Sequence, residues 1–425
     1  MNLTQTIEYI YGLNGGIQPT QERFRALLGV LGDPHAAFQS VHVAGTNGKG
    51  STCAFLSGIL TAHGKKTGLF TSPYLERFNE RMQIDHMPIG DGELIDTIES
   101  VRRAAQRIEG RHGPIRPFEA ITAAAFLWFA ESGVDVAVIE TGLGGGGDAT
   151  NVLDPSHIAI TRISHDHTQR LGSRLEDIAK EKAGIIKQNA FVAVHPQVQP
   201  VEDVLFGHAL QTGCRAHFLK PHNVSVLEDS MRRRAFDLIF GGALLGDVEI
   251  PLLGRHQIDN AASAACIALD MGIGEDAIRR GLKRMQWPGR LELFCDANGC
   301  VLLDGAHNEG GAQALAEALE RYFTGVPKVL VCAVSKDKDI AAMARVWAPV
   351  FDGGVVATSC PHLTDAAQTA EHFAAAGARV VIREDAEHAL FTARAMNNAL
   401  VVCAGSLYLV GALRTVLRRS FGATH

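Results

Sequence analysis

The 425-residue chain is too long for one compact hydrophobic core, so its length predicts two or three domains. Its composition, 46% hydrophobic and 20% charged, is typical of a globular protein and excludes wholesale disorder. With 40 basic and 46 acidic residues, the formal net charge is −6. This balance gives no reason to expect a nucleic acid or an anionic membrane as partner.

No segment predicts a membrane span, because the most apolar stretch, Ile121–Ala130, is half as long as a bilayer requires. Residues 1–16 lack a basic start and a continuous apolar run, so we expect no secretory signal and a cytoplasmic protein. The eight cysteines include no CxxC pair. They predict free thiols in a reducing compartment rather than disulfides or a zinc site.

Short apolar runs alternate with longer helical segments, which is typical of an α/β protein with a mostly parallel sheet. In the first half we expect strands at 40–44, 135–139, 157–163 and 191–194, and helices at 50–63 and 119–130. Residues 215–250 are β-rich but irregular, and we expect them to form an antiparallel edge of the first domain.

From about Cys300 the alternation begins again and predicts a second doubly wound unit. Its strands are expected at 301–304, 328–334, 353–359, 378–382 and 399–405, with helices after Asn308, from about Ile340, around 386–395 and up to about Arg418. A Pro-Gly pair interrupts the helical pattern within Met285–Arg290, so we place a hinge there. The prediction is an N-terminal domain of residues 1–288 and a C-terminal Rossmann-like domain of residues 289–425.

The segment Gly45-Thr-Asn-Gly-Lys-Gly-Ser51 lies between a predicted strand and a predicted helix. Backbone N–H groups at a glycine-rich helix N-terminus bind anions, and Lys49 can neutralise phosphate charge. Ser51 or Thr52 could reach a nucleotide-bound Mg²⁺. The usual GxxxxGK[ST] spacing is not met, and the alternative is a glycine turn with an exposed lysine. Its setting favours phosphate binding, which makes residues 1–288 a P-loop domain.

A second glycine-rich segment, Glu140–Asn151, follows a buried strand. An acidic side chain at a strand end of an open α/β sheet is a candidate Mg²⁺ ligand. The alternative is a mobile loop with a solvated Glu140. In the next motif, Ser164–Thr168, one histidine joining Glu140 on a metal is favoured over a zinc pair. Lys180 and Lys182 follow, and by themselves they predict a solvated helix face.

Three further polar segments lie before, at and after the predicted hinge. Leu253–Ala262 is a polar helix start, for which capping and function are equally good explanations. Trp287–Arg290 and Leu303–Asn308 place an Asp and a His at the end of the first strand of the second domain. This position favours a nucleotide cleft between the domains over a plain capped turn.

In this order, the motifs resemble the folylpolyglutamate synthase/dihydrofolate synthase family of the Mur ligase superfamily. The resemblance covers most of the chain and is carried by Leu27–Pro34, His42–Ser51, Thr71–Leu75, Phe118-Glu119, Glu140–Asn151, Asp166-His167, Glu181–Gly184, His256-Gln257, Trp287–Arg290, Asp304–Asn308 and Lys336–Asp339. It implies a Mur-ligase-like ATP-dependent enzyme, usually monomeric, that joins L-glutamate to a folate or dihydropteroate carboxylate through an acyl phosphate.

The resemblance also implies roles for individual residues. Lys49, Lys182 and His307 are expected to be catalytic, and Lys182 to be carbamylated. ATP is expected at Asn47, Gly48, Lys49, Gly50, Ser51, Thr52, Asn260, Arg290 and Asp304. Two Mg²⁺ ions are expected at Ser51, Ser72, Glu140, His167 and Lys182, and the acceptor at Phe118, Glu119, Thr122, Asp148 and Ala149.

The chain departs from the family pattern at the acceptor side. Gly146-Gly147 stand where the family usually has Arg-Leu, Tyr74 replaces a histidine, and Arg162–His165 is atypical. Three hypotheses therefore remain: a folate-type ligase, a related ligase with a non-folate carboxylate acceptor, and an ATP-binding protein without ligase activity. The intact set Lys49, Glu140, His167 and Lys182 argues against the third.

Overall fold

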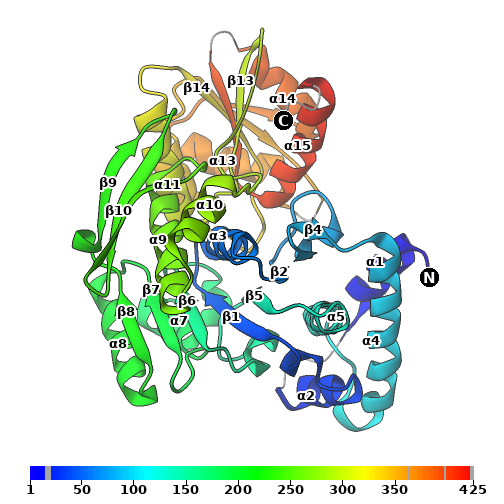
Figure 1. Cartoon of the computed structure of the whole chain (residues 1–425). Coiled ribbons are helices and arrows are strands. Elements are labelled where there is room, and N and C mark those ends of the chain that lie inside the picture. The colour runs from blue at the N-terminus through cyan, green and yellow to red at the C-terminus, as the bar shows by residue number, and fades with distance from the viewer. Residues whose placement is uncertain (15–20, 362, 397–398, 422–425) are drawn as a thin grey trace.

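The structure, a computed structural model, describes residues 1–14, 21–361, 363–396 and 399–421. Two α/β units lie one above the other in Figure 1, with a small antiparallel sheet beside them. The predicted fold class is confirmed: both units have a parallel-rich sheet covered by helices. Among the described residues, no helix has the length and apolarity to span a bilayer.

The N-terminal unit is built on an eight-stranded sheet in the order β4-β3-β2-β5-β1-β6-β7-β8. Neighbouring strands from β2 to β8 in this order are parallel, and β3 and β4 are antiparallel. The strands are β1 Gln39–Ala44, β2 Thr67–Phe70, β3 Met82–Ile84, β4 Met87–Pro88, β5 Val136–Glu140, β6 His157–Ile160, β7 Phe191–Val194 and β8 Arg215–Phe218. Strand β6 is shorter than predicted, so residues 161–167 form a loop at the site.

Alternate residues of β5 separate the two cores of this unit, because neighbouring side chains of a strand point to opposite faces. Val136 and Val138 pack toward α3, α9 and α10, whereas Ala137 and Ile139 pack toward the helices on the right of Figure 1. The helices are α1 Leu3–Gly12, α2 Gln21–Val30, α3 Lys49–Ala62, α4 Asp91–His112, α5 Pro117–Glu131, α6 Thr168–Leu171, α7 Leu175–Ala183, α8 Gln199–Thr212, α9 Arg255–Asp270 and α10 Glu275–Arg284; the 3₁₀ turns are η1 Pro34–Ala36, η2 Phe78–Arg81, η3 Ala149–Val152 and η4 Pro221–Asn223.

Residues 215–250 differ from the prediction of one irregular sheet edge. Strand β8 is the parallel edge of the large sheet, whereas β9 Val224–Asp229, β10 Arg234–Phe240 and β11 Ala243–Glu249 form a separate antiparallel sheet. Phe236, Leu238 and Val248 of this sheet are completely buried in the core with α9 and α10. The pattern is irregular because β-bulges interrupt the pairing of β10 with β9 and with β11, so that the adjacent residues Ala235 and Phe236 are both buried.

The C-terminal unit has a six-stranded sheet in the order β12-β13-β17-β14-β15-β16, in which only the β12–β13 pair is antiparallel. Leu302 and Leu330 face one core, while Val301, Leu303 and Val329 face the other. The elements are β12 Glu292–Asp296, β13 Gly299–Leu303, α11 Glu309–Tyr322, β14 Lys328–Cys332, α12 Ile340–Trp347, β15 Gly354–Thr358, α13 Ala366–Ala375, β16 Val380–Arg383, α14 Ala386–Arg394, β17 Leu400–Ala404 and α15 Leu407–Phe421. The sequence patterns did not predict β12 or α13.

The expectation that all cysteines are free is wrong for one pair. Cys295 and Cys300 lie opposite each other in the β12–β13 hairpin and form a disulfide. The other six cysteines are free. The pair was missed because β12, an exposed edge strand with polar residues at both ends, was not predicted. Without the β12–β13 hairpin, the sequence does not indicate that the two cysteines lie opposite each other.

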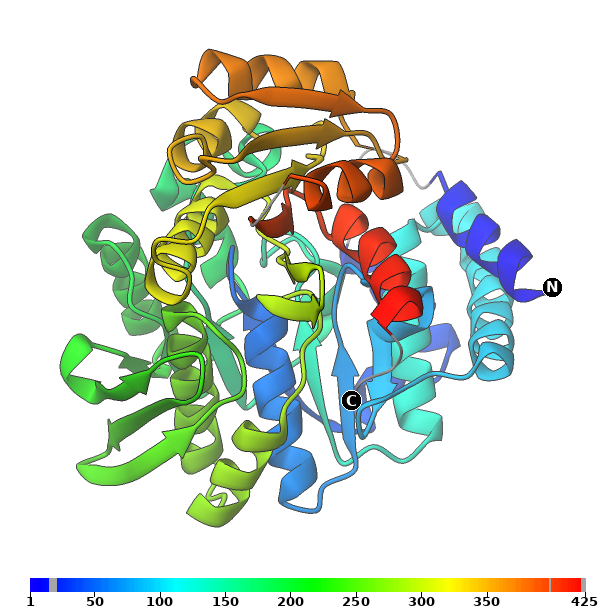
Figure 2. The same cartoon turned by 90° about the horizontal axis from the view of Figure 1, so that it is seen from above.

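The C-terminal helix α15, red in Figure 2, packs onto the N-terminal unit. Its Gly411 lies so close to the chain at Leu75 that a side chain there would come within 1.8 Å of the Leu75 carbonyl oxygen. Arg414 of the same helix pairs with Glu76 of the N-terminal unit and with Glu292. The two units therefore touch through backbone contacts and ion pairs. A domain boundary at residues 288/289 stays a prediction.

Candidate active site

The loop Gly45–Gly48 joins β1 to α3, whose first turn contains Lys49–Ser51, at the carboxyl edge of the large sheet. Gly48 has φ +90°, and a side chain there would lie 2.3 Å from Oδ1 of Asn260. At Gly45, a side chain would lie 1.8 Å from Oγ1 of Thr161. The glycines thus let the loop pack against both neighbours. The first N–H groups of α3 have no partner within the helix, and this arrangement binds phosphate.

Lys49 and Glu140 meet beside this loop. Nζ of Lys49 lies 3.2 Å from the carbonyl oxygen of Thr46 and 3.7 Å from Oε1 of Glu140. Oε2 of the buried Glu140 accepts the backbone N–H of Ser72 at 3.0 Å. Burial raises the pKa of Glu140, and the Lys49 ammonium acts in the opposite direction. The Glu140 carboxylate can therefore bind a cation at the edge of this loop.

Lys182 reaches the same loop from α7. Its side chain is buried, and Nζ donates to the carbonyl oxygen of Gly45 at 2.6 Å. Burial, helped by the charge of Lys49, lowers the pKa of Lys182 to about 7. A large fraction of this amine is therefore neutral near pH 7. The expectation of a solvated helix face holds only for Lys180, which is exposed.

The glycine-rich loop after Glu140 is fastened to α7. The N–H of Gly146 donates to the carbonyl oxygen of Glu181 at 2.8 Å, and that of Gly147 to Oε1 of Glu181 at 3.0 Å. The Asp148 carboxylate accepts two N–H groups of the same loop, those of residues 142 and 143. These contacts favour an ordered wall of the site over the mobile loop of the alternative interpretation.

A polar cluster joins the two units across the site. Nζ of Lys338 lies 2.6 Å from Oδ1 of Asp166 and 3.2 Å from Nε2 of His167. Nδ2 of Asn308 donates to Asp166 at 2.9 Å and to Asn47 at 3.0 Å. Neither Lys338 nor Asn308 was predicted from the sequence to be a functional site residue. Both residues belong to segments that carry the family resemblance, Lys336–Asp339 and Asp304–Asn308. Their place in these segments is the sequence feature that could have identified them.

His307 lies in this cluster with its Nε2 3.7 Å from Oδ2 of Asp166. Its Nδ1 lies 2.8 Å from the carbonyl oxygen of Gly305, which can only accept. In the neutral ring the proton is therefore on Nδ1, and Nε2 carries the lone pair. Burial acts in the opposite direction, but a hydrogen bond from His307 in its protonated form and the Lys338 ammonium hold the pKa of Asp166 well below its usual range. Asp166 stays ionised at neutral pH.

Arg290 and Asp304 come from the C-terminal side of the cleft. The buried Asp304 carboxylate accepts the N–H groups of residues 291 and 306, so it holds together the two segments that face the P-loop. Nη1 of Arg290 would be 2.1 Å from a side chain at Gly305, so only glycine leaves room for the guanidinium there. Arg290 thus lies opposite Glu140; burial lowers the pKa of its guanidinium, and the charges of Asp304 and Glu140 act in the opposite direction.

A cavity of about 290 Å³ lies beside these groups, between the two units. The predicted site residues that line it are Asn47, Gly48, Lys49, Gly50, Ser51, Ser72, Glu140, His167, Lys182, Asn260, Arg290, Asp304 and His307. Thr52 is completely buried, and its hydroxyl has no hydrogen-bond partner. Tertiary structure therefore gathers the predicted ATP and metal residues, apart from Thr52, around one space.

The residues predicted for the acceptor lie in the fold outside this cavity. Glu119 is buried and forms an ion pair with Arg23 at 2.8 Å, and Thr122 donates to the carbonyl oxygen of Phe118 at 2.7 Å. Asp148 stabilises its own loop, and Ala149 is buried. Contact of these residues with a substrate stays a prediction.

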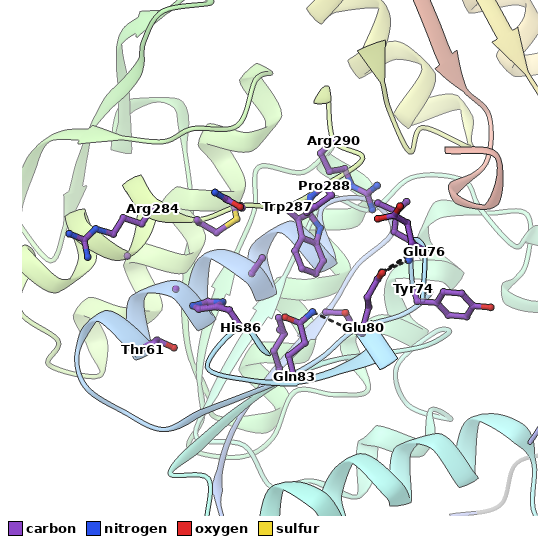
Figure 3. Close-up of a pocket in the computed structure, with 18 of the residues that line it drawn as sticks. Thr61, Tyr74, Glu76, Glu80, Gln83, His86, Arg284, Trp287, Pro288 and Arg290 are labelled. Carbon is purple, nitrogen blue, oxygen red and sulfur yellow. Dashed lines mark hydrogen bonds between the residues drawn. The ribbon is translucent and has the colours of Figure 1, made fainter. Parts of the chain in front are cut away.

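A larger cavity of about 690 Å³ adjoins the first one, and the two share Pro73, Arg290 and Leu407 in their walls. Figure 3 shows the Trp287 side chain in the middle of this cavity, between Arg290 and Gln83. Tyr74, which replaces the family's histidine, lines it as well. The cavity thus offers an aromatic, partly polar space directly beside the P-loop.

The donor chemistry of the smaller cavity fits Mg²⁺. The ion prefers hard oxygen ligands and keeps several waters, and the Glu140 carboxylate and the Ser51 hydroxyl are of this kind. Within the part of the chain that the structure describes, no group of three His, Cys, Asp or Glu side chains forms a ready metal cage. A site completed by water and phosphate oxygens agrees with both observations.

Fold and site together define a Mur ligase. The Mur ligase middle domain family matches residues 97–268, and the Mur ligase glutamate ligase domain family matches residues 289–407.

The chain is 34% identical to the folylpolyglutamate synthase of Lacticaseibacillus casei, over 98% of this chain and 99% of that protein. It is 37% identical to the dihydrofolate synthase/folylpolyglutamate synthase of Bacillus subtilis, over 79% of this chain and 80% of the relative. The structure of Mycobacterium tuberculosis folylpolyglutamate synthase with ADP has a TM-score of 0.92, with 32% identity and 98% of each chain covered. An FPGS complex with AMPPCP and folate has a TM-score of 0.85, with 33% identity and 98% and 100% covered.

The chain therefore belongs to the folylpolyglutamate synthase/dihydrofolate synthase family, and it is an ATP-dependent ligase. This confirms the resemblance found in the sequence.

Proposed function

We propose that this enzyme forms an amide between L-glutamate and the carboxylate of a folate-type acceptor, dihydropteroate or a reduced folate. The observation that carries the proposal is the meeting of Lys49, Glu140 and Lys182 at one glycine-rich loop, with Arg290 of the other side facing them. Such a set of charges suits transfer of a phosphoryl group to an unreactive carboxylate.

In the first step, a carboxylate oxygen of the acceptor attacks the γ-phosphorus of ATP, and the bond to the ADP oxygen breaks. The products are an acyl phosphate and ADP. The N–H groups at the start of α3 and the ammonium of Lys49 bind the phosphates, while Arg290 covers them from the C-terminal side. Bound Mg²⁺ would neutralise phosphate charge, held by Ser51, Ser72, Glu140, His167 and a carbamylated Lys182.

In the second step, the glutamate amine attacks the acyl carbon and the C–O bond to phosphate breaks. We assign His307 to accept the amine proton at Nε2, the nitrogen that carries the lone pair when Nδ1 donates to Gly305. The ionised Asp166, 3.7 Å away, would stabilise the imidazolium formed. Contacts across the cleft, such as Asp166 with Lys338, would keep water away from the acyl phosphate.

The larger cavity is the proposed place for the body of the acceptor. It shares Pro73 and Arg290 with the wall of the cavity proposed for the nucleotide, and the indole of Trp287 offers a flat apolar surface to an aromatic ring system. Contacts with Phe118, Glu119, Thr122, Asp148 and Ala149 remain the alternative placement from the sequence. A cytoplasmic monomer with no nucleic-acid or membrane partner also remains a prediction.

A second candidate is ligation to a non-folate carboxylate. It is favoured by Gly146-Gly147, where a cation usual in the family is missing, and by Tyr74 in the wall of the larger cavity. The intact charge set at the P-loop argues against an ATP-binding protein without ligase activity.

Phosphate release with ATP, Mg²⁺ and L-glutamate tests the proposal, run in parallel with dihydropteroate, with tetrahydrofolate and without acceptor. Turnover that requires both glutamate and one of these acceptors is the expected result, and it would show which addition the enzyme performs. ATP binding with no turnover on either acceptor would reject the folate assignment and favour the second candidate.

A further inference from the structure

The loop between β14 and α12 brings two side chains of the C-terminal unit to His167 of the N-terminal unit. His167 precedes α6 with φ +49°, so its ring projects from a tight turn. Nζ of Lys338 lies 3.2 Å from its Nε2, and Oδ2 of Asp337 lies 3.2 Å from its Nδ1. Both ring nitrogens therefore have a charged partner from the other side of the cleft.

These two contacts determine which nitrogen of His167 carries the proton. A lysine ammonium can only donate, so Nε2 must accept from Lys338 and is unprotonated. The proton of the neutral ring is then on Nδ1, where the Asp337 carboxylate can accept it. The two contacts are consistent with the same tautomer, and the opposite tautomer would place a proton against the ammonium.

Asp337 has no evident structural role in the fold. Its side chain is 48% exposed, and its carboxylate also lies 3.7 Å from Nζ of Lys338. Asp339, two residues later, begins α12 by accepting the N–H of Ala342 at 2.9 Å. Asp339 therefore caps α12, and Asp337 is available to accept a hydrogen bond from His167.

We propose that Asp337 is a positioning residue that holds His167 as the Nδ1–H tautomer, with the Nε2 lone pair directed at the cation site of the cleft. The proposal rests on the proposed function, in which His167 helps to hold Mg²⁺. Histidine ligands of metals generally donate their second ring N–H to a carboxylate, which fixes the ring and strengthens binding. Here that carboxylate comes from the other unit, so the ligand is fully formed only when the two units are in contact.

The same geometry places Lys338 where it competes with a metal ion for Nε2 of His167. Its ammonium occupies the Nε2 lone pair and lies 2.6 Å from Asp166, where a bound cation would draw on the same negative charge. Lys338 must leave Nε2 before a metal ion can take it. The contact between the units and the binding of the cation are thus coupled at a single imidazole nitrogen.

The tautomer can be measured without metal or substrate. Long-range ¹H–¹⁵N spectra of the full chain with ¹⁵N-histidine, in which His167 is assigned by its loss in His167→Gln, distinguish the two tautomers. The proposal expects Nδ1–H in the parent chain and also in Lys338→Ala, where Asp337 alone fixes the ring, and a shift toward Nε2–H when Asp337→Ala is added to Lys338→Ala. Nε2–H in the parent chain, or an unchanged tautomer when Asp337→Ala is added to Lys338→Ala, would overturn it.

Binding of Mn²⁺ in the presence of a non-hydrolysable ATP analogue provides the second readout. Asp337→Ala is expected to weaken Mn²⁺ binding about 10-fold or more, the usual effect of removing such a partner. Asp337→Asn retains an accepting oxygen and should recover most of the affinity, whereas a pure charge effect would make the two variants equal and reject the proposal. Glu371→Gln, an exposed carboxylate on α13, is the control for loss of one negative charge.

The two hypotheses fail in different ways. If Mn²⁺ leaves the His167 resonances of the parent chain unbroadened, His167 is not a ligand, and that part of the proposed function is wrong. The tautomer spectra of the metal-free chain still decide whether Asp337 positions the ring. Equal melting temperatures of the variants confirm that they are folded.

Discussion

Nζ of Lys182 and the carbonyl oxygen of Gly45 lie 2.6 Å apart, although 137 residues separate them in the chain. The contact places a buried amine directly behind the phosphate loop. Since burial lowers the pKa of this amine to about 7, neutral amine is present at physiological pH. Only the neutral form reacts with CO₂, so the environment of Lys182 supports the proposed carbamate.

Replacing Lys182 tests that proposal. Lys182→Ala should lower kcat about 100-fold or more, because it removes a proposed ligand of the metal ion, and short carboxylates should restore part of the activity. Lys180→Ala, on the exposed side of the same helix, is the matched control. In ¹³CO₂-labelled parent protein the carbamate signal should increase from pH 6 to pH 8 as the amine loses its proton. An active Lys182→Ala would reject the carbamate.

Lys49→Ala should abolish turnover by weakening ATP binding and by leaving Glu140 buried without its cation. We expect a loss of at least about 100-fold in kcat/KM, measured by phosphate release together with calorimetric ATP binding. Lys65→Ala removes an exposed lysine just after the same helix and should have no effect. Near-normal activity of Lys49→Ala would contradict the P-loop assignment.

The close approach of Gly48 to Asn260 predicts that no side chain is tolerated at Gly48. Gly48→Ala combines a left-handed backbone, which costs about 1–2 kcal/mol, with a contact of 2.3 Å to Oδ1 of Asn260. ATP binding should be lost. Gly64 has the same φ of +90° but open space around it, so Gly64→Ala isolates the backbone cost. If both variants bind ATP equally well, packing between α3 and α9 does not shape the site.

Stability should fall in mild acid because two histidines are buried in the neutral form. Burial lowers the pKa of His42 and of His195 to about 3, whereas an unfolded histidine titrates near 6.5. Below pH 6.5 the unfolded state binds more protons, so each group removes about 1.4 kcal/mol of unfolding free energy per pH unit. Above pH 6.5 the two histidines are neutral in the unfolded state as well, so the unfolding free energy no longer changes with their titration.

Urea unfolding at several pH values measures this slope. It should be flatter in His42→Gln, which cannot titrate, and unchanged in the control His222→Gln, which replaces an exposed histidine. An unchanged slope in His42→Gln would show that other groups cause the acid sensitivity.

Restoring the family's Arg-Leu at Gly146-Gly147 should be compatible with the fold. Neither glycine has a positive φ, and the nearest atom to a side chain at either position is 3.6 Å away, an ordinary contact. If the acceptor is a folate, the added cation should lower its KM about 10-fold, because one charge-assisted hydrogen bond contributes about 1.5–3 kcal/mol. A raised KM with a good melting temperature would favour a non-folate acceptor.

Local sequence determined many of the helices and strands of this enzyme and most of its candidate site residues. The strand before the P-loop, the helix after it and the alternation of the C-terminal unit follow from apolar periodicity, which a single segment carries by itself. The ATP and metal candidates followed because glycines and charged residues at strand ends mark a site in such sheets. The hairpin strand β12 and its Cys295–Cys300 disulfide were missed because an exposed edge strand has little apolar pattern.

Tertiary structure decided the protonation states and hydrogen-bond partners of the site residues, which no single segment can show. The amine of Lys182 becomes neutral only because folding buries it beside Gly45 and Lys49, and its helix by itself predicts a solvated lysine. The ring of His167 receives its partners from residues 337 and 338, across the cleft between the units. Protonation and hydrogen-bond direction depend on distances between segments far apart in the chain, and these distances exist only in the folded molecule.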